Sequence, residues 1–286
     1  MRSGNLGAFL GEVIGTFTLI LLGDGVVANV GLAPRLAAGA YDWNTITLGW
    51  AFAVIVAVYV SGGVSGAHLN PAVTIALAVK RGFPWAKVPV YIAGQLVGAF
   101  LGAVGVYLVY REGLVAAGMP NVWSTGPGSV FGEAFWGGAG GAAQGTYTLM
   151  NASVAEIFGT MVLMLGVLAA GDQRNLGLKL NLGPFLVGGA VLAVGLSLGG
   201  PSGYAINPAR DLGPRVLGAL VGTEGLFEGS YWIVAPVLMP IIGGIIGVLV
   251  YDAFVTRFLP APAAAVAAGE GSAEVMAGSG EREAGA

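Results

Sequence analysis

The apolar residues of this chain gather into long stretches that are separated by short polar or glycine-rich segments. A helix needs about 20 apolar residues to cross the hydrocarbon core of a bilayer. Two apolar stretches, 71–79 and 208–221, are too short to cross and are predicted to be half-helices that enter from opposite faces. Six others are long enough to be spans, near residues 7–30, 45–62, 88–110, 152–171, 182–199 and 231–254. The pattern predicts an all-α membrane protein.

The same phrase precedes each half-helix. Residues 65–72 read Ser-Gly-Ala-His-Leu-Asn-Pro-Ala, and residues 202–209 read Ser-Gly-Tyr-Ala-Ile-Asn-Pro-Ala. Asn is a good N-cap and Pro suits the first helical position, so each phrase predicts a helix start. The backbone before each Asn is non-helical, because proline disfavours helical geometry in the residue before it. Lipid tolerates such backbone only where it lines a cavity, so two copies predict one cavity built from two halves.

The two halves also repeat outside these phrases. The pattern Glu-x-x-Gly-Thr-x-x-Leu-x-Leu begins at Glu12 and again at Glu156, at nearly the same offset as the two Asn-Pro-Ala copies. Each half, about 7–110 and 152–256, therefore holds three spans and one half-helix. Because three is odd, the second half must be inverted, an arrangement in which broken helices meet near the membrane midplane. The two Asn-Pro-Ala ends are expected to face each other.

Composition agrees with a multi-pass membrane protein. Of 286 residues, 56% are hydrophobic and only 9% are charged, against about 25% charged in soluble domains. The net charge of −3 leaves no basic face for nucleic acid. The absence of Cys excludes disulfides and, with a single His, argues against a Cys/His metal site. The apolar run after Arg2 lacks a small-residue cleavage site, so it is interpreted as a retained span with the mature chain starting near Met1.

The paired phrases resemble those of the major intrinsic proteins, the aquaporin and glycerol-facilitator family. One Asn-Pro-Ala is an ordinary helix start, but two copies, each preceded by Ser-Gly and the second followed by Arg, are specific in an apolar chain. The resemblance covers about residues 6–257. The second copy continues into Arg210 and Asp211, which is similar to the glycerol-facilitator (aquaglyceroporin) branch of prokaryotic type, in which Asp follows the Arg.

This resemblance implies a channel of six spans and two re-entrant half-helices. It would pass glycerol and other small uncharged solutes passively, with water and urea as further candidates, and exclude ions and protons. It also implies a homotetramer in the bilayer with one pore per subunit and no cofactor. The nearest alternative is a water-selective pore of the same fold, against which Asp211 and the small Gly195 argue.

Two alternatives come from other classes of protein. A coupled secondary transporter with inverted repeats would need carboxylates or a coordinating cluster along its pathway, and both are scarce here. An integral membrane enzyme would need a nucleophile, base and metal set, which the sequence does not offer.

Basic residues in the short loops predict the orientation. Most would lie inside if the N-terminus is inside, so both termini are expected in the cytoplasm and the chain in the plasma or inner membrane. The inner set is Arg2, Lys80, Arg81, Lys87, Arg174, Lys179 and Arg257, against Arg35 and Arg111 outside. Residues 1–258 would form the channel and 259–286 a disordered tail. The outer loop 111–150 either folds over the pore mouth or has no role.

The pore centre is expected at Asn70 and Asn207. Their amides would donate to a passing hydroxyl, while the half-helix N-termini add positive potential that opposes cations and protons. The alternative is that both residues are only N-caps. The predicted centre also includes Pro71, Ala72, Pro208 and Ala209. The backbone carbonyls expected to line the pore are those of Gly66, Ala67, His68, Leu69, Gly203, Tyr204, Ala205 and Ile206.

The outer constriction is expected around Arg210, which stays charged and needs partners inside the membrane region. The alternative is an Arg that extends to the interface. By resemblance, the other constriction residues are Trp50, Gly195 and Tyr204. Without their register to the motifs, the two aromatic residues would be taken as interface or core residues.

Two carboxylates occupy matched places in the halves and are expected to be buried. By resemblance, Glu12 and Glu156 hold the irregular loops by accepting hydrogen bonds from loop backbone or from His68. A proton relay would need a chain of titratable groups, and His68 is the one candidate nearby. Asp211 and Arg215 stand at positions i and i+4, which predicts a structural salt bridge.

Overall fold

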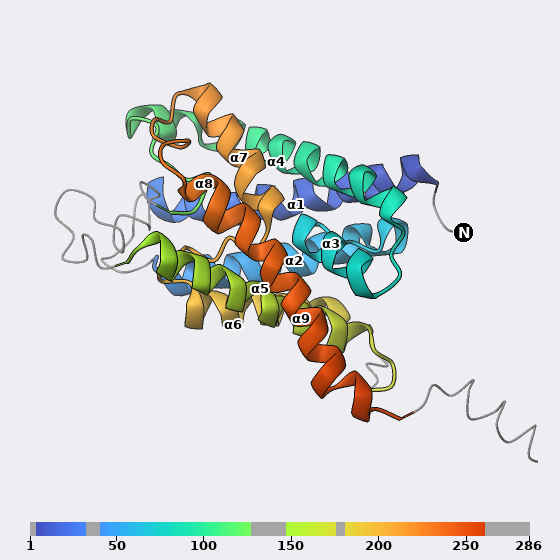
Figure 1. The fold of residues 1–286 in the computed structure, drawn as a ribbon. Helices are drawn as coiled ribbons and strands as arrows, with labels where there is room; N and C mark the ends of the chain where they lie inside the picture. Colours follow the sequence, from blue (N-terminus) through green and yellow to red (C-terminus); the bar gives the residue numbers. More distant parts are fainter. Residues whose placement is uncertain (1–3, 33–40, 127–146, 176–180, 261–286) are drawn as a thin grey trace, which may run out of the picture.

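A computed structural model describes residues 4–32, 41–126, 147–175 and 181–260, and this part of the chain is helical (Figure 1). The remaining residues lie outside the described part. They include the predicted tail from residue 261 onward, most of the outer loop from 127 to 146, and the basic residues Arg2, Arg35 and Lys179 used for orientation.

The helices follow the predicted order in each half. The first half holds α1 (Asn5–Leu32), α2 (Trp43–Ser65), the half-helix α3 (Pro71–Lys80), a 3₁₀ turn (Trp85–Lys87) and α4 (Val88–Ala116). The second half holds α5 (Leu149–Gly171), α6 (Gly183–Leu198), the half-helix α7 (Pro208–Val221), α8 (Tyr231–Ile233), a π-helical segment (Val234–Leu238), α9 (Met239–Phe254) and a 3₁₀ turn (Thr256–Phe258).

Local capping chemistry explains where several of these helices begin. The Asp42 side chain accepts a hydrogen bond from the Thr45 N–H at 3.0 Å, and the Thr45 hydroxyl accepts one from the Asp42 N–H. This reciprocal pair is a capping box, and it starts α2. Thr148 and Asn151 form the same reciprocal arrangement at the start of α5. These polar caps satisfy N–H groups that a helix leaves unpaired in its first turn.

Five of the described helices are long and apolar enough to cross a bilayer. The predicted span over 182–199 is present as α6, but its 16 residues rise only about 24 Å, less than a hydrocarbon core of about 30 Å. Large apolar side chains are exposed on the outside of the bundle, including Leu108, Leu220 and Phe254 at 70–74%. Such a surface suits lipid rather than water, and the protein is a membrane protein.

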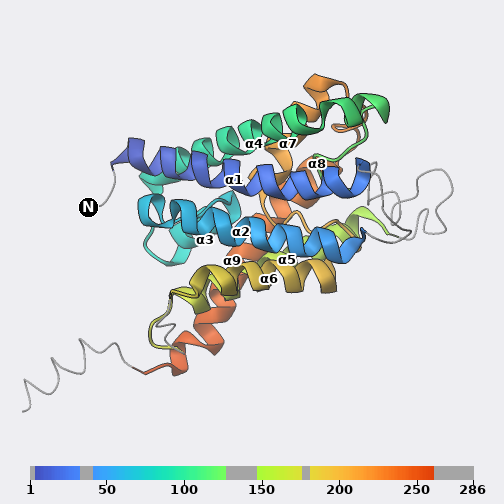
Figure 2. The same ribbon diagram turned by 180° about the vertical axis from the view of Figure 1, so that it is seen from behind.

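The helix pairings repeat between the halves. α1 packs on α2 and α4, and α5 packs on α6 and α9. Between the halves, α2 packs on α6, and each half-helix packs on a span of the other half: α7 on α4 and α3 on α9. Figure 2 shows α1, α2 and α6 side by side. A side chain at Gly98 or at Gly243 would clash with the backbone of α1 or α5, so these glycines let the helices touch closely.

The last predicted span, 231–254, is helical but not regular. Residues Val234–Leu238 form a π-helical segment between α8 and α9. Pro236 and Pro240 supply no backbone N–H, so the regular α-helical hydrogen bonds cannot continue through them. The helix takes the wider π-helical form there.

Candidate functional site

Each half-helix begins at an Asn that caps it. The Asn70 side-chain oxygen accepts a hydrogen bond from the Ala72 N–H at 2.9 Å. The Asn207 oxygen accepts from the N–H groups of Ala209 and Arg210, at 3.0 and 3.3 Å. Both Asn residues have extended backbone and a Pro follows each, as the helix-start pattern predicts.

The same two side chains also join the halves. The Asn70 amide donates to the Ile206 carbonyl at 2.8 Å, and the Asn207 amide donates to the Leu69 carbonyl at 2.7 Å. Both are 7% exposed or less, and both line a cavity. The ends of α3 and α7 therefore face each other, and each Asn makes contacts beyond those of a cap.

The two loops before the half-helices have unusual backbone geometry. Four residues other than glycine have positive φ, with values of 41–52°: Ala67, Leu69, Tyr204 and Ile206. An L-residue in this left-handed region costs about 1–2 kcal/mol. Strain of this kind persists only where surrounding contacts hold it, and it gathers at functional sites.

The two buried carboxylates supply those contacts. Glu12 accepts from the N–H groups of residues 68–69 at 3.1 and 2.7 Å, and Glu156 accepts from those of residues 205–206 at 2.7 and 2.6 Å. Both Glu side chains are 0% exposed. Each carboxylate therefore satisfies two loop N–H groups in the protein interior.

Further polar groups surround Glu12, and of these Gln95 was not predicted from the sequence. The Ser65 hydroxyl donates to it at 2.6 Å and the Gln95 amide at 2.7 Å. His68 contacts Glu12 through its backbone, while its ring nitrogen lies 3.1 Å from the Thr74 hydroxyl. The His68 ring also packs against Phe83 and Tyr91, with both centroid distances 4.7 Å.

Replacing either carboxylate by its amide, Glu12→Gln or Glu156→Gln, is expected to lower stability by about 1–3 kcal/mol, because one acceptor becomes an amide NH₂ that faces a backbone N–H. The solute preference of the protein that still folds should stay unchanged. Thermal unfolding in detergent and flux per folded protein would measure the two effects separately. Normal stability with a changed glycerol-to-water ratio would contradict the structural role of these groups.

A cavity of about 600 Å³ runs beside both loops. Apolar residues of α2, α5 and α6 line it, including Val54, Val58, Leu163, Val187 and Val191. Residues of the two loops line it as well: Gly66, Ala67, His68, Leu69, Tyr204, Ala205 and Ile206. Gly203 is not among the lining residues and lies against Thr125 instead. Most of the lining residues are therefore apolar, and seven of them belong to the two loops.

Three of the predicted constriction residues line this cavity together: Trp50, Tyr204 and Arg210. The Arg210 guanidinium carbon lies 4.2 Å from the centre of the Trp50 ring, a cation–π contact. Arg210 also donates to the Trp123 carbonyl at 3.3 Å and is 8% exposed, so it does not extend to the interface.

Gly195, the fourth predicted constriction residue, is closely packed against its neighbours. It does not line the cavity, and a Cβ at this position would lie 2.8 Å from both the Thr47 methyl group and the Tyr204 ring. The Trp43 indole donates to the Gly195 carbonyl at 3.0 Å and packs edge-on against Tyr204 at 5.6 Å. The missing side chain therefore makes room for the Tyr204 ring, which lines the cavity.

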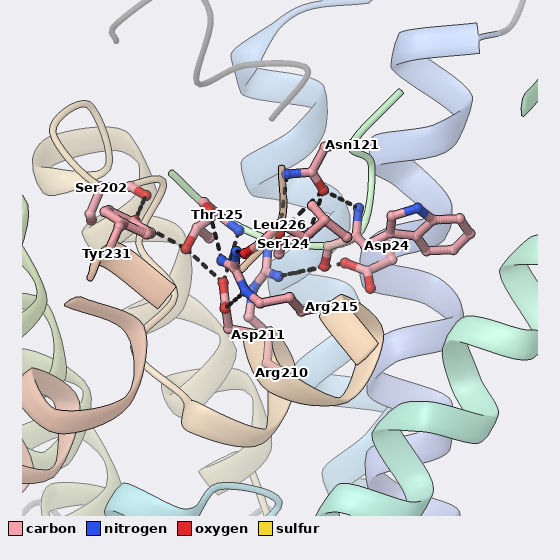
Figure 3. Close-up of polar contacts among 11 residues, drawn as sticks. Asp24, Asn121, Ser124, Thr125, Ser202, Arg210, Asp211, Arg215, Leu226 and Tyr231 are labelled. Carbon is pink, nitrogen blue, oxygen red and sulfur yellow. Dashed lines mark hydrogen bonds and ion pairs between the residues drawn. The ribbon is translucent and has the colours of Figure 1, made fainter. Parts of the chain in front are cut away.

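Part of the outer loop is built into the site. Residues 121–126 are buried, and Thr125 donates to the Asp211 carboxylate through its N–H at 2.8 Å and its hydroxyl at 2.7 Å (Figure 3). Arg215 bonds the other Asp211 oxygen at 2.8 Å and the Thr125 carbonyl at 3.0 Å. The Tyr231 hydroxyl donates to the Ser202 carbonyl at 2.7 Å. This network ties residues 121–126 to α7.

Several site residues escaped the sequence analysis. Asp24 is an acid inside a predicted span, so the rule that singled out Glu12 could have found it. Trp123 and Thr125 carry no local signal, because they act from an irregular loop.

Comparison with known proteins places this geometry in a family. A family model described as major intrinsic protein matches residues 1–251. The chain belongs to this family. It is 44% identical over 254 residues to a probable glycerol uptake facilitator protein of Thermotoga maritima, covering 86% of this chain and 99% of the relative. The glycerol uptake facilitator protein of Bacillus subtilis is 43% identical, covering 86% and 84%.

A solved structure supports the same assignment. The aquaglyceroporin of Plasmodium falciparum matches this major intrinsic protein with a TM-score of 0.76 and 32% identity, covering 88% of this chain and 97% of that one. The resemblance inferred from the paired motifs and the aquaporin-like fold are thereby confirmed. The family consists of channels and facilitators rather than enzymes.

Proposed function

We propose that this protein is a passive channel for glycerol and other small uncharged solutes, including water, that excludes ions and protons. The observation that carries the proposal is a cavity lined by apolar residues and by the two loops, with Trp50, Tyr204 and Arg210 among its lining residues. A polyol has carbon atoms along one side and hydroxyl groups along the other, so apolar side chains together with the carbonyls of the loop backbone would match it. The relatives named as glycerol uptake facilitators support the same solute.

The constriction has groups suited to each face of a polyol. The Trp50 ring would contact its CH groups, and the Arg210 guanidinium would donate to its hydroxyls. At the cavity centre, Asn70 and Asn207 each keep an amide hydrogen beyond the one used across the halves. The N-termini of α3 and α7 add positive potential there, which opposes cations.

A coupled transporter is less well supported by the lining of the cavity. Among the described lining residues, Arg210 is the one with a permanently charged side chain, and Glu12 and Glu156 are occupied by the loops. We further propose residues 1–258 as the channel domain, assembled as a homotetramer in the plasma membrane with both termini in the cytoplasm. The exposed apolar surface suits lipid and neighbouring subunits alike.

The proposal predicts solute flux that depends on neither a pH gradient nor membrane voltage, because the lining offers fixed dipoles. Stopped-flow light scattering of liposomes that contain the purified protein would compare water, glycerol and urea with empty liposomes. Glycerol flux well above the lipid background is expected, without proton or sodium current. Water flux without glycerol flux would favour the water-selective alternative, and solute-coupled current would favour a transporter.

A further inference from the structure

One carboxylate near the constriction has no role in the site described so far. Asp24 lies in α1 and is 0% exposed. One of its oxygens is 3.6 Å from the Arg210 guanidinium, and Figure 3 draws the two side chains together. Within the part of the chain that the structure describes, neither Asp24 oxygen has a hydrogen-bond partner. The ion pair with Arg210 is therefore its principal contact.

Gly23, the residue before Asp24, is in contact with the aromatic ring that packs on the Arg210 guanidinium. A side chain at Gly23 would clash with the Trp50 ring, so that ring rests directly on α1 at this glycine. Trp50 in turn lies under Arg210 at 4.2 Å. Two consecutive residues of α1 thus contact the predicted constriction: Gly23 contacts Trp50, and Asp24 contacts Arg210.

The other carboxylate of this region, Asp211, already has hydrogen-bond partners on both of its oxygens. Asp211 binds Arg215 with one oxygen and Thr125 with the other. The remaining partner of Arg210, the Trp123 carbonyl, carries no net charge. Arg cannot lose its proton in a protein, and a buried charge needs a counter-charge. Asp24 is thus the acid within ion-pair distance of Arg210 among the described residues.

We propose that Asp24 is a positioning and charge-balancing residue of the selectivity filter. It holds the guanidinium against Trp50 and cancels its charge, so that the constriction offers hydrogen-bond donors without acting as an anion site. This inference rests on the proposed channel function. It adds to that function the reason why a fixed cation in the constriction does not bind or pass small anions.

Asp24→Asn is expected to lower the glycerol-to-water permeability ratio by about tenfold, the factor that follows from weakening one charge-assisted contact. It should also admit formate or nitrate, which the wild type excludes. Stopped-flow flux of water and glycerol, and an anion-sensitive dye inside the same liposomes, would measure both. Asp42→Asn is the matched control, because Asp42 is an exposed N-cap and Asn caps equally well.

A double variant separates positioning from a purely structural role. If Asp24 acts through Arg210, then adding Asp24→Asn to Arg210→Val should leave the permeability ratio of Arg210→Val unchanged. An equal change in both backgrounds would overturn the proposal, as would a wild-type ratio and intact anion exclusion in folded Asp24→Asn.

The proposal can still be tested if Asp24→Asn alone does not fold. The double variant buries no unpaired charge, so it is expected to regain assembly on size-exclusion chromatography, and failure to regain it would overturn the pairing. If wild-type liposomes pass no glycerol, the proposed function fails. Normal wild-type glycerol flux with an unchanged Asp24→Asn ratio would reject the inference alone.

Discussion

Gly195→His is expected to reduce glycerol flux by about 100-fold, the factor that an added barrier of about 3 kcal/mol to glycerol passage produces, while water flux largely persists. The reason lies in the contacts of Gly195, where even a Cβ would stand 2.8 Å from the Thr47 methyl group and the Tyr204 ring. An imidazole must push the Tyr204 ring toward the cavity and narrow it. Both fluxes would be measured in the same liposomes and normalised to protein.

Alanine variants on the same helix provide the control. Gly195→Ala should cause a smaller loss of glycerol flux, whereas Gly189→Ala should cause none, because nothing lies within 4 Å of a Cβ at Gly189. Equal loss of water and glycerol flux in Gly195→His would indicate general damage rather than a narrowed filter. Unchanged glycerol flux would show that Tyr204 does not control the width of the pathway.

Asn207→Asp is expected to make the pore leak cations and to lower stability by about 2 kcal/mol or more. The wild-type amide donates to the Leu69 carbonyl at 2.7 Å, and a carboxylate would place an oxygen against that oxygen. It would also bring a negative charge to the centre, where the positive ends of α3 and α7 now oppose cations. Sodium flux into liposomes and thermal unfolding would report the two effects.

A serine variant distinguishes charge from geometry. Asn207→Ser keeps an acceptor that can cap α7 but removes the contact to the other half and adds no charge. It should lose stability without leaking cations. Wild-type flux, stability and ion exclusion in both variants would mean that Asn207 is only a cap.

Much of the fold could be predicted because its signals are local. The predicted half-helix 208–221 matches α7 at both ends, since Asn and Pro start a helix whatever surrounds it. Apolar runs long enough to cross lipid located the spans, with ends within a few residues. Spacing alone also predicted the Asp211 and Arg215 pair, which the helix repeat brings to 2.8 Å.

Other features depend on neighbours that are distant in the chain. The π-helical segment around Pro236 and the short α6 alter spans that looked uniform from hydropathy. The sequence singled out Gly195 as small but did not show that the Tyr204 ring packs against it. Which ring occupies a gap depends on how helices pack, and periodicity along one helix does not contain that information.

The sequence by itself determined the spans, the two half-helix starts, the inverted repeat and hence the family, because each rests on periodicity, capping or a repeated phrase. Only the tertiary structure decided how the Arg210 side chain is held. Arg210 takes its partners from Asp24 in α1 and from Trp123 in an irregular loop. A fixed buried cation must find acceptors wherever the fold brings them, and no local rule of sequence says which distant residues those are.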